Sequence, residues 1–362
     1  MKTKVVRIDE NNIDMKVIEE AGRILKRGGL VAFPTETVYG LGGDALSGES
    51  SARIYAAKGR PSDNPLIIHI ADMDDLCAIA RNVPAGAYLL ADRYWPGPLT
   101  MIFHKADIVP NATTGGLETV AVRMPSHKTA RALIRAAGGF VAAPSANRSG
   151  RPSPTLAKYV IEDLDGRVDL IIDGGPAQIG LESTIVDFTE PEPVILRPGY
   201  ITQDMIREVA GQVQTDRTVM EADSGQAPRA PGMKYRHYAP KGSLFLVQGA
   251  ADQVCAYINE QTALKRRQGV RTGVIAAQET AERYTADVVK SMGKRHDGET
   301  AARELFRILR EFDEENAEFI YAEFFEGQGV GEAVMNRLLK AAGHQIIQAD
   351  TDKKQDQKGE RT

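Results

Sequence analysis

Residues 26–44 read KRGGLVAFPTETVYGLGGD, and this stretch carries the densest sequence signal in the first part of the chain. A helical pattern over residues 15–27 ends at two glycines, and the apolar run 30–33 predicts a short buried strand that a proline stops. Polar residues and a glycine-rich turn follow. Open α/β sheets place ligand sites in such turns, although a threonine and a glutamate before an apolar turn are equally typical of a capped loop.

Helical and strand patterns alternate on both sides of this stretch. In the first 210 residues they predict helices over 15–27, 48–57 and 129–137 and strands over 30–33, 66–70, 99–103, 119–123, 140–143, 168–172 and 184–187. After residue 241 they predict strands over 243–247, 272–276 and 319–324 and helices over 251–267, 300–313 and 332–342. We therefore expect an α/β sheet domain followed by a small, parallel, doubly wound one.

The length of 362 residues also favours two domains. Residues 215–241 contain several prolines and glycines and little hydrophobic periodicity, so they predict a linker. The expected boundaries are a first domain over 1–214, this linker, a second domain over 242–348 and a disordered tail over 349–362, which has almost no apolar residues.

Composition argues against several classes of protein. The formal net charge of −4 does not suit a globally basic nucleic-acid binder. No apolar run approaches the roughly 20 residues that a membrane span requires, and the N-terminus lacks the apolar region of a secretory signal. The two cysteines, Cys77 and Cys255, predict neither a disulfide framework nor a thiolate zinc site, and the six histidines form no zinc-binding motif. We expect a soluble, cytoplasmic protein.

Three cationic residues are candidates for binding phosphate or carboxylate. Lys58 and Arg60 flank a glycine, so a point charge and a bidentate fork lie together where the backbone allows close approach. Arg123 ends a predicted strand before a proline and suits a carboxylate or phosphate. Such residues are also typical of exposed basic turns and of ordinary ion pairs. His69 lies in an apolar run, where a histidine is more often a core residue than a ligand.

Hydroxyl and amide side chains follow the strand predicted over 140–143. They are Ser145, Asn147, Ser149 and Ser153. They can bind polar edges and phosphate oxygens, but no histidine or aspartate accompanies Ser145 in a nucleophile elbow. The glycines of residues 327–331 lie between a strand and a helix as in a dinucleotide fingerprint, yet Glu332 occupies the place of the third glycine.

Taken together, six stretches resemble the threonylcarbamoyl-AMP synthase family, the YrdC-like enzymes. They are KRGGLVAFPTETVYGLGGDA, IYAAKGRPSDNPLIIHI, ETVAVRMPS, AAPSANRSGRPSPT, GLESTIVDF and ILRPGY, and they fall in the family's order within residues 10–210. The later stretches APGMKYRHYAPK and GQGVGEAVMNRLLKAAG resemble the long, two-domain form of the family. The resemblance implies a YrdC-like twisted mixed sheet with helices, then the linker, then a Rossmann-like doubly wound parallel sheet.

The resemblance also implies the reaction. L-threonine, bicarbonate or CO2 and ATP would give L-threonylcarbamoyl-AMP and pyrophosphate, a nucleotidyl transfer that serves threonylcarbamoyl modification of the adenosine next to the anticodon in tRNA. Other proteins would carry out the transfer to tRNA, and this chain would contact tRNA weakly if at all. Mg²⁺ would arrive on the triphosphate of ATP, because no all-protein metal cage is visible in the sequence.

Carried over motif by motif, the resemblance assigns polar residues of these stretches to the two substrates. L-threonine would be held by Thr37, His69, Arg123, Ala143 and Ser183. ATP would be held by Lys58, Arg60, Asn64, Thr119, Ser145, Asn147, Ser153 and Arg197, with His237 and Tyr238 of the linker closing over the phosphates as an active-site lid. Within this set, Lys58 and Arg60 are the expected catalytic residues, and Arg123 is the expected partner of the threonine carboxylate.

The sequence is also compatible with two other functions. A YrdC-like domain could instead grip double-stranded RNA or tRNA without chemistry, although the balanced charge does not favour it and such binding would weaken steeply with salt. The other alternative is an O-carbamoyltransferase that uses a carbamoyl-adenylate, as related domains do in hydrogenase-maturation proteins. Those proteins carry acylphosphatase and zinc-finger modules, and this sequence has neither. Pyrophosphate release that depends on threonine separates the three readings.

Overall fold

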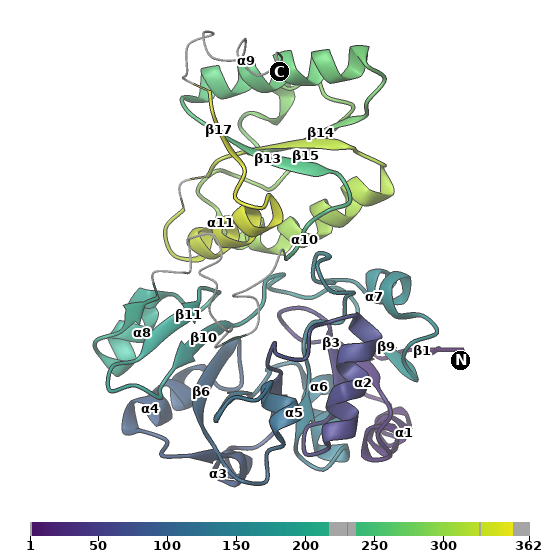
Figure 1. The fold of residues 1–362 in the computed structure, drawn as a ribbon, viewed down its shortest axis with the longest axis vertical. Helices are drawn as coiled ribbons and strands as arrows, with labels where there is room; N and C mark the ends of the chain where they lie inside the picture. Colours follow the sequence, from purple (N-terminus) through teal and green to yellow (C-terminus); the bar gives the residue numbers. More distant parts are fainter. Residues whose placement is uncertain (1, 217–229, 231–236, 326, 350–362) are drawn as a thin grey trace, which may run out of the picture.

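The computed structural model describes residues 2–216, 230, 237–325 and 327–349, and it holds two α/β parts built on separate sheets (Figure 1). The first part contains a mixed twelve-stranded sheet in the order β1-β9-β2-β3-β8-β4-β7-β6-β10-β11-β12, with β5 beside β6. The predicted fold class is confirmed. The predicted tail lies outside the described residues from residue 350 onward, as does most of the predicted linker. No helix in the described ranges is long and apolar enough to cross a membrane.

The elements of the first part have these bounds. The strands are β1 (Lys4–Arg7), β2 (Val31–Phe33), β3 (Gly40–Asp44), β4 (Ile67–His69), β5 (Ala80–Arg81), β6 (Leu99–Lys105), β7 (Thr119–Arg123), β8 (Val141–Ala142), β9 (Leu170–Asp173), β10 (Thr184–Asp187), β11 (Val194–Arg197) and β12 (Gln214–Thr215). The helices are α1 (Met15–Lys26), α2 (Gly48–Lys58), α3 (Leu76–Ile79), α4 (Ala85–Tyr94), α5 (Asn111–Thr114), α6 (Lys128–Ala136), α7 (Ala157–Leu164) and α8 (Gln203–Ala210).

Strand β2 shows how the first sheet is packed on both faces. Val31 and Phe33 belong to a core with Leu133 of α6, whereas Ala32 between them belongs to a different core with Ile54 of α2. Successive side chains of a strand point to opposite faces, so a strand covered on both sides is apolar at every position. This is why the sequence shows a continuous apolar run here.

The glycine-rich stretch after β2 is a strand, so the predicted turn is wrong. Gly40–Asp44 forms β3, which pairs antiparallel with β2 and with β8. A Cβ at Gly42 would lie 2.9 Å from the ring of Phe33, and one at Gly43 would lie 2.9 Å from the side chain of Ile54. The glycines let neighbouring side chains pack directly on the backbone of β3, and they thereby remove the side-chain pattern that would reveal a strand.

The second part contains a five-stranded sheet in the order β15-β14-β16-β13-β17, and every pair in it is parallel. Its strands are β13 (Ser243–Gln248), β14 (Thr272–Ala276), β15 (Val288–Ser291), β16 (Phe319–Glu323) and β17 (Ile346–Gln348), and its helices are α9 (Ala251–Arg267), α10 (Gly298–Glu314) and α11 (Val330–Ala341). Figure 1 shows α9 on the face away from the first part, and α10 and α11 between the second sheet and the first part. Helices on both faces make this the expected doubly wound sheet.

Candidate active site

The strands of the first sheet bring predicted site residues to one edge. β4 and β7 run parallel and end side by side at His69 and Arg123, which are register partners. β6 is antiparallel to β7, so its start lies at the same edge, with Thr100 opposite Arg123. β10 begins beside the start of β6, directly after Ser183, and the antiparallel β11 ends there at Arg197. The topology of the sheet therefore gathers residues that are far apart in the sequence.

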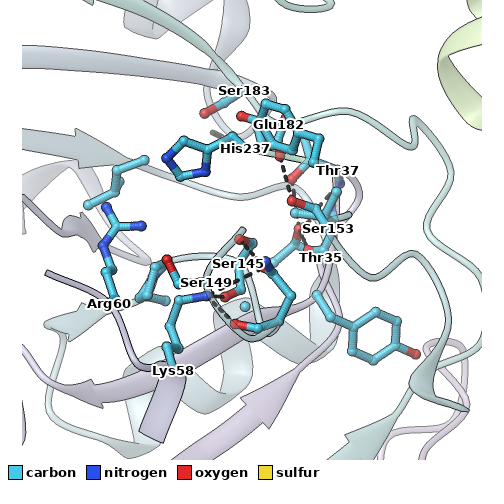
Figure 2. Close-up of a pocket in the computed structure, with 18 of the residues that line it drawn as sticks. Thr35, Thr37, Lys58, Arg60, Ser145, Ser149, Ser153, Glu182, Ser183 and His237 are labelled. Carbon is cyan, nitrogen blue, oxygen red and sulfur yellow. Dashed lines mark hydrogen bonds between the residues drawn. The ribbon is translucent and has the colours of Figure 1, made fainter. Parts of the chain in front are cut away.

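A cavity with about 690 Å³ of empty space, counted with its opening to solvent, lies at this edge. The predicted site residues that line it are Thr37, Lys58, Arg60, His69, Arg123, Ala143, Ser145, Asn147, Ser153, Ser183, Arg197, His237 and Tyr238. Figure 2 shows Lys58, Arg60, Ser145 and His237 around the same open space. The cavity is lined by cations, hydroxyls and amides, which are the groups that bind anionic substrates.

Arg123 is held in a fixed orientation by the loop between β2 and β3. Its Nη1 donates to Thr37 Oγ1 at 2.9 Å, its Nη2 donates to Glu36 Oε1 at 2.6 Å, and its Nε donates to Gly97 O at 3.3 Å. The ion pair with Glu36 is buried, with 5 % of each side chain exposed. The Thr35 and Thr37 hydroxyls lie 2.9 Å apart. A guanidinium fixed in this way is suited to bidentate recognition of a carboxylate.

Arg197 is a second fixed cation at the same edge. Its Nε donates to Ser183 O at 3.0 Å and its Nη2 donates to Ser183 Oγ at 3.2 Å. The Ser183 hydroxyl also lies 2.7 Å from Thr100 Oγ1. Burial lowers the pKa of Arg197 to about 10, so the guanidinium still carries its charge at neutral pH.

Lys58 ends helix α2 and reaches into the loop after β8. Its Nζ donates to the carbonyl oxygens of Ser145 and Asn147, the second at 2.6 Å. The loop is attached to β3 by a backbone bridge between Ser145 and Gly40. Burial, followed by the charge of Arg60, holds the pKa of the Lys58 ammonium well below its usual value. Lys58 is therefore a desolvated amine bonded only to neutral oxygens among the described residues, and a bound anion would favour its charged form.

Gly59 turns the chain between Lys58 and Arg60. It caps α2 in the left-handed region at φ 62°, where glycine is favoured. Beyond this turn Arg60 donates to Asn64 O at 3.3 Å and to Pro65 O at 3.1 Å. The two cations reach the cavity from adjacent sides (Figure 2). That placement suits a polyphosphate, which has anionic oxygens along its whole length.

Two buried histidines face the cavity from different parts of the chain. Burial, and then the charge of Arg123, lowers the pKa of His69 to about 3. Burial, and then the charge of Arg60, lowers the pKa of His237 to about 3. Both rings are therefore neutral at physiological pH. His69 Nδ1 lies 3.2 Å from Ile67 O, whereas His237 Nε2 is buried and has no hydrogen-bond partner in the described part of the chain.

Tyr238, near the end of the predicted linker, lines the cavity and contacts the second part. Its ring centre lies 5.4 Å from that of His237 and 5.1 Å from that of Phe306 on α10. Its φ of 67° lies in the left-handed region, which is uncommon for a tyrosine and marks a backbone constrained by its surroundings. The next residue, Ala239, donates from its backbone N to Gly150 O at 2.9 Å.

Two predicted ATP ligands do not line the cavity. Thr119 begins β7, at the opposite end of that strand from Arg123. Asn64 is buried in the loop before β4, and its Oδ1 has no hydrogen-bond partner among the residues described. Both roles stay predictions. Two further residues belong to the site, although no role was predicted for them from the sequence: Glu36 pairs with Arg123, and Glu182 lines the cavity. Both lie inside the quoted stretches, but the role of a carboxylate in a cation-lined cavity cannot be predicted until its cationic partner is known.

The fold and site define an α/β domain with a cation-lined cavity at a sheet edge, in which fixed arginines face a second group of cations and hydroxyls. The family model of Sua5, YciO and YrdC, described as telomere recombination, matches residues 23–199. The model of the threonylcarbamoyl-AMP synthase C-terminal domain matches residues 201–343.

Relatives of known name match nearly the whole chain. It is 48 % identical over 351 residues to the threonylcarbamoyl-AMP synthase of Bacillus subtilis, covering 96 % of this chain and 100 % of the relative. It is 47 % identical over 345 residues to the enzyme of that name from Pyrococcus abyssi, covering 95 % and 99 %. The crystal structure of P. abyssi Sua5 complexed with L-threonine matches with a TM-score of 0.89 at 46 % identity, covering 96 % of this chain and 99 % of the other. The chain belongs to the threonylcarbamoyl-AMP synthase family, as the six sequence stretches predict.

Proposed function

We propose that this chain joins L-threonine, bicarbonate or CO2 and ATP into L-threonylcarbamoyl-AMP, with release of pyrophosphate. One observation carries the proposal: a single cavity holds buried Arg123 beside Thr37 in one region and Lys58 and Arg60 in another. The first pair suits an amino acid, and the second suits a triphosphate. The relatives described above carry the name of this activity, and the P. abyssi structure contains L-threonine.

The threonine would lie at the ends of β4 and β7. Its carboxylate would pair with Arg123, and its hydroxyl would bond to Thr37 or Ser183, which line the cavity. His69 is neutral, so its ring can accept a hydrogen bond from the amine without adding positive charge. Ala143 lines the same region with a side chain small enough to leave room for the substrate.

The chemistry requires positioning more than acid–base catalysis. The threonine amine adds to CO2 and loses a proton, which gives a carbamate whose oxygen is already anionic. That oxygen attacks the α-phosphorus of ATP, the bond from the α-phosphorus to the oxygen bridging the β-phosphate breaks, and pyrophosphate leaves with the electron pair. Fixed cations in a buried cavity can hold the two reactants in line and stabilise the charge that develops on the phosphates.

ATP would extend from Lys58 and Arg60 along the loop after β8. The remaining proposed ATP ligands are Asn64, Thr119, Ser145, Asn147, Ser153 and Arg197, with His237 and Tyr238 as the lid. Mg²⁺ would be bound by the triphosphate and water. Glu182, the carboxylate among the described lining residues, is already bonded to Ser153 and to Arg337 of the second part. Mg²⁺ on the triphosphate would neutralise charge on the leaving pyrophosphate.

We also infer that separate proteins transfer the threonylcarbamoyl group to tRNA, that tRNA contact by this chain is weak, and that the reaction takes place in the cytoplasm. The net charge of −4 supports the second point. Incubation of the chain with ATP, Mg²⁺, bicarbonate and L-threonine, followed by mass spectrometry, tests the proposed reaction. L-threonylcarbamoyl-AMP is the expected product, and unchanged ATP would contradict the proposal.

A further inference from the structure

Two arginines of the second part are fully buried against the wall of the cavity in the first part. Arg310 lies on α10 and Arg337 on α11, and 0 % of either side chain is exposed. Both make hydrogen bonds to loops of the first part that carry cavity-lining residues. Among the described residues these bonds satisfy most of the buried donors, although Arg337 Nη2 has no hydrogen-bond partner there. Because a buried guanidinium is costly when its donors are unbonded, the positions of these loops and of the arginines depend on each other.

Arg337 connects three separate segments of the cavity wall. Its Nε donates to Glu182 Oε2 at 3.1 Å, in the loop before β10. Its Nη1 donates to Pro198 O at 2.8 Å, directly after Arg197 at the end of β11. The centre of its guanidinium lies 6.0 Å from the ring centre of Tyr238. Glu182, Arg197 and Tyr238 all line the cavity.

Glu182 lies between Arg337 and Ser153, a proposed ATP ligand, and is hydrogen-bonded to both. Its Oε1 accepts a hydrogen bond from Ser153 Oγ at 2.6 Å (Figure 2). Burial alone would raise the pKa of the Glu182 carboxyl, but the charges of Arg337 and Arg197 bring it below its usual value. An ionised carboxylate can only accept, so the Ser153 hydroxyl must donate to it. The oxygen of Ser153 is then left to accept a hydrogen bond from a ligand in the cavity.

Arg310 holds the same loop from its other side. Its Nη2 donates to Pro152 O at 2.6 Å, one residue before Ser153, and to Asp163 Oδ2, also at 2.6 Å. Asp163 Oδ2 in turn accepts from the backbone N of Arg148 at 3.1 Å. Arg310 therefore contacts the loop that carries Ser145, Asn147 and Ser153 directly, whereas Arg337 acts on it through Glu182.

We propose that Arg337 is a positioning residue of the ATP site: it fixes Glu182, which orients the Ser153 hydroxyl as an acceptor toward a hydroxyl or amino group of the bound nucleotide. The second part is thus a structural component of the catalytic cavity. This inference rests on the proposed function only in taking ATP as the ligand.

The test compares Arg337→Met, Arg337→Lys, Glu182→Gln and the Arg337→Met/Glu182→Gln double variant with the unaltered chain. ATP affinity is measured by titration calorimetry, KM and kcat by pyrophosphate release, and the folded state by circular dichroism. Glu314→Gln is the matched control, because Glu314 accepts from Lys158 at 2.8 Å across the same boundary but on the exposed surface.

We expect Arg337→Met to weaken ATP binding and raise the KM for ATP about tenfold, as if the nucleotide had lost one hydrogen bond, with a smaller change in kcat. Arg337→Lys keeps a cation beside Glu182 and should recover most of this loss. The double variant should bind ATP no more weakly than Arg337→Met, and the control should match the unaltered chain.

Unaltered ATP affinity in folded Arg337→Met would overturn the proposal, as would ATP binding by Arg337→Lys as weak as that of Arg337→Met. Independent, multiplicative effects of the Arg337 and Glu182 substitutions would also overturn it. If Arg337→Met does not fold, Glu182→Gln decides: weaker ATP binding in that variant supports the proposal, and unaltered ATP affinity would overturn it. If the unaltered chain binds ATP but releases no pyrophosphate, the proposed function fails, while the calorimetric comparison still decides the role of Arg337.

Discussion

Arg123 donates to Glu36 and to Thr37 at the same time, at 2.6 and 2.9 Å, so the guanidinium proposed to bind the substrate carboxylate is already fixed before a ligand enters. The second carboxylate oxygen of Glu36 is buried and has no hydrogen-bond partner within the described ranges. Each Nη atom of Arg123 makes one of these hydrogen bonds and carries two N–H groups, so each has a second donor for a substrate carboxylate. A preorganised cation loses less side-chain entropy on binding than a mobile one.

Glu36→Ala should raise the KM for threonine about tenfold, because Arg123 loses the charged hydrogen bond that orients it. Glu36→Gln keeps an acceptor of the same shape and should cost about threefold. Steady-state pyrophosphate release at saturating ATP measures both values. A Glu36→Ala variant with an unaltered KM for threonine would show that Arg123 does not need this partner or does not bind threonine.

Lys58→Ala and Arg60→Ala should each lower the rate of adenylate formation by orders of magnitude. The loss of a charged phosphate contact costs about 1.5–3 kcal/mol in binding, and more where charge develops in the transition state. Arg53→Ala is the control: Arg53 lies on the same helix but is 43 % exposed and pairs with Asp169 instead. Rates like those of the unaltered chain in either folded variant would remove Lys58 or Arg60 from the catalytic site.

The site should distinguish threonine by its hydroxyl as well as by its carboxylate. An analogue without the hydroxyl would lose its proposed hydrogen bond to Thr37 or Ser183, and sites built around a substrate hydroxyl reject such analogues by about 10⁴ or more. Serine keeps the hydroxyl and lacks only a methyl group. Serine should therefore support pyrophosphate release better than 2-aminobutyrate does, and the reverse order would contradict the proposed threonine site.

Stability should fall with acidification because of the two buried histidines. The pKa of His69 and of His237 is about 3 in the folded chain, below the usual 6.5, so the unfolded chain binds protons that the folded chain does not. Above about pH 6.5 both histidines are mostly neutral in the folded and the unfolded chain, so they do not lower stability. As the pH falls toward 3, the free energy of unfolding decreases, by about 2 kcal/mol for each histidine between pH 7 and pH 5.

Denaturant unfolding at several pH values checks this prediction. His69→Gln should make the free energy of unfolding less dependent on pH between 7 and 5, whereas the same substitution at exposed His104 should not. An equal pH dependence in the His69→Gln variant and the unaltered chain would mean that His69 is not the neutral, buried group described here.

Local patterns were sufficient to predict the strands that carry His69 and Arg123, because both are short apolar runs bounded by proline. They were not sufficient for β3, whose glycines carry no side-chain pattern, or for β1 and β17, which lie at the edges of their sheets and are not fully buried at any position. Helices α4 and α8 were also missed. In each case pairing or packing with distant residues decides the structure, and the propensity of the segment alone does not.

Some residues of the site were predictable from the sequence and others were not. Those with an obvious affinity for anions, such as Lys58 and Arg60, were predictable by type, and the family resemblance supplied most of the others. The roles of Glu182 and Arg337 were not predictable, because their contact joins residues 155 positions apart and in different domains. Their function depends on burial and on a hydrogen-bond chain, neither of which is visible in a single sequence.

The proposed reaction requires that pyrophosphate release from ATP depend on both threonine and bicarbonate. We predict rapid release when ATP, Mg²⁺, L-threonine and bicarbonate are all present, with release falling to background when either threonine or bicarbonate is omitted. Release that is independent of threonine, or that requires carbamoyl phosphate instead, would contradict the assignment of the Arg123 region to threonine. It would thereby contradict the proposed synthesis of L-threonylcarbamoyl-AMP.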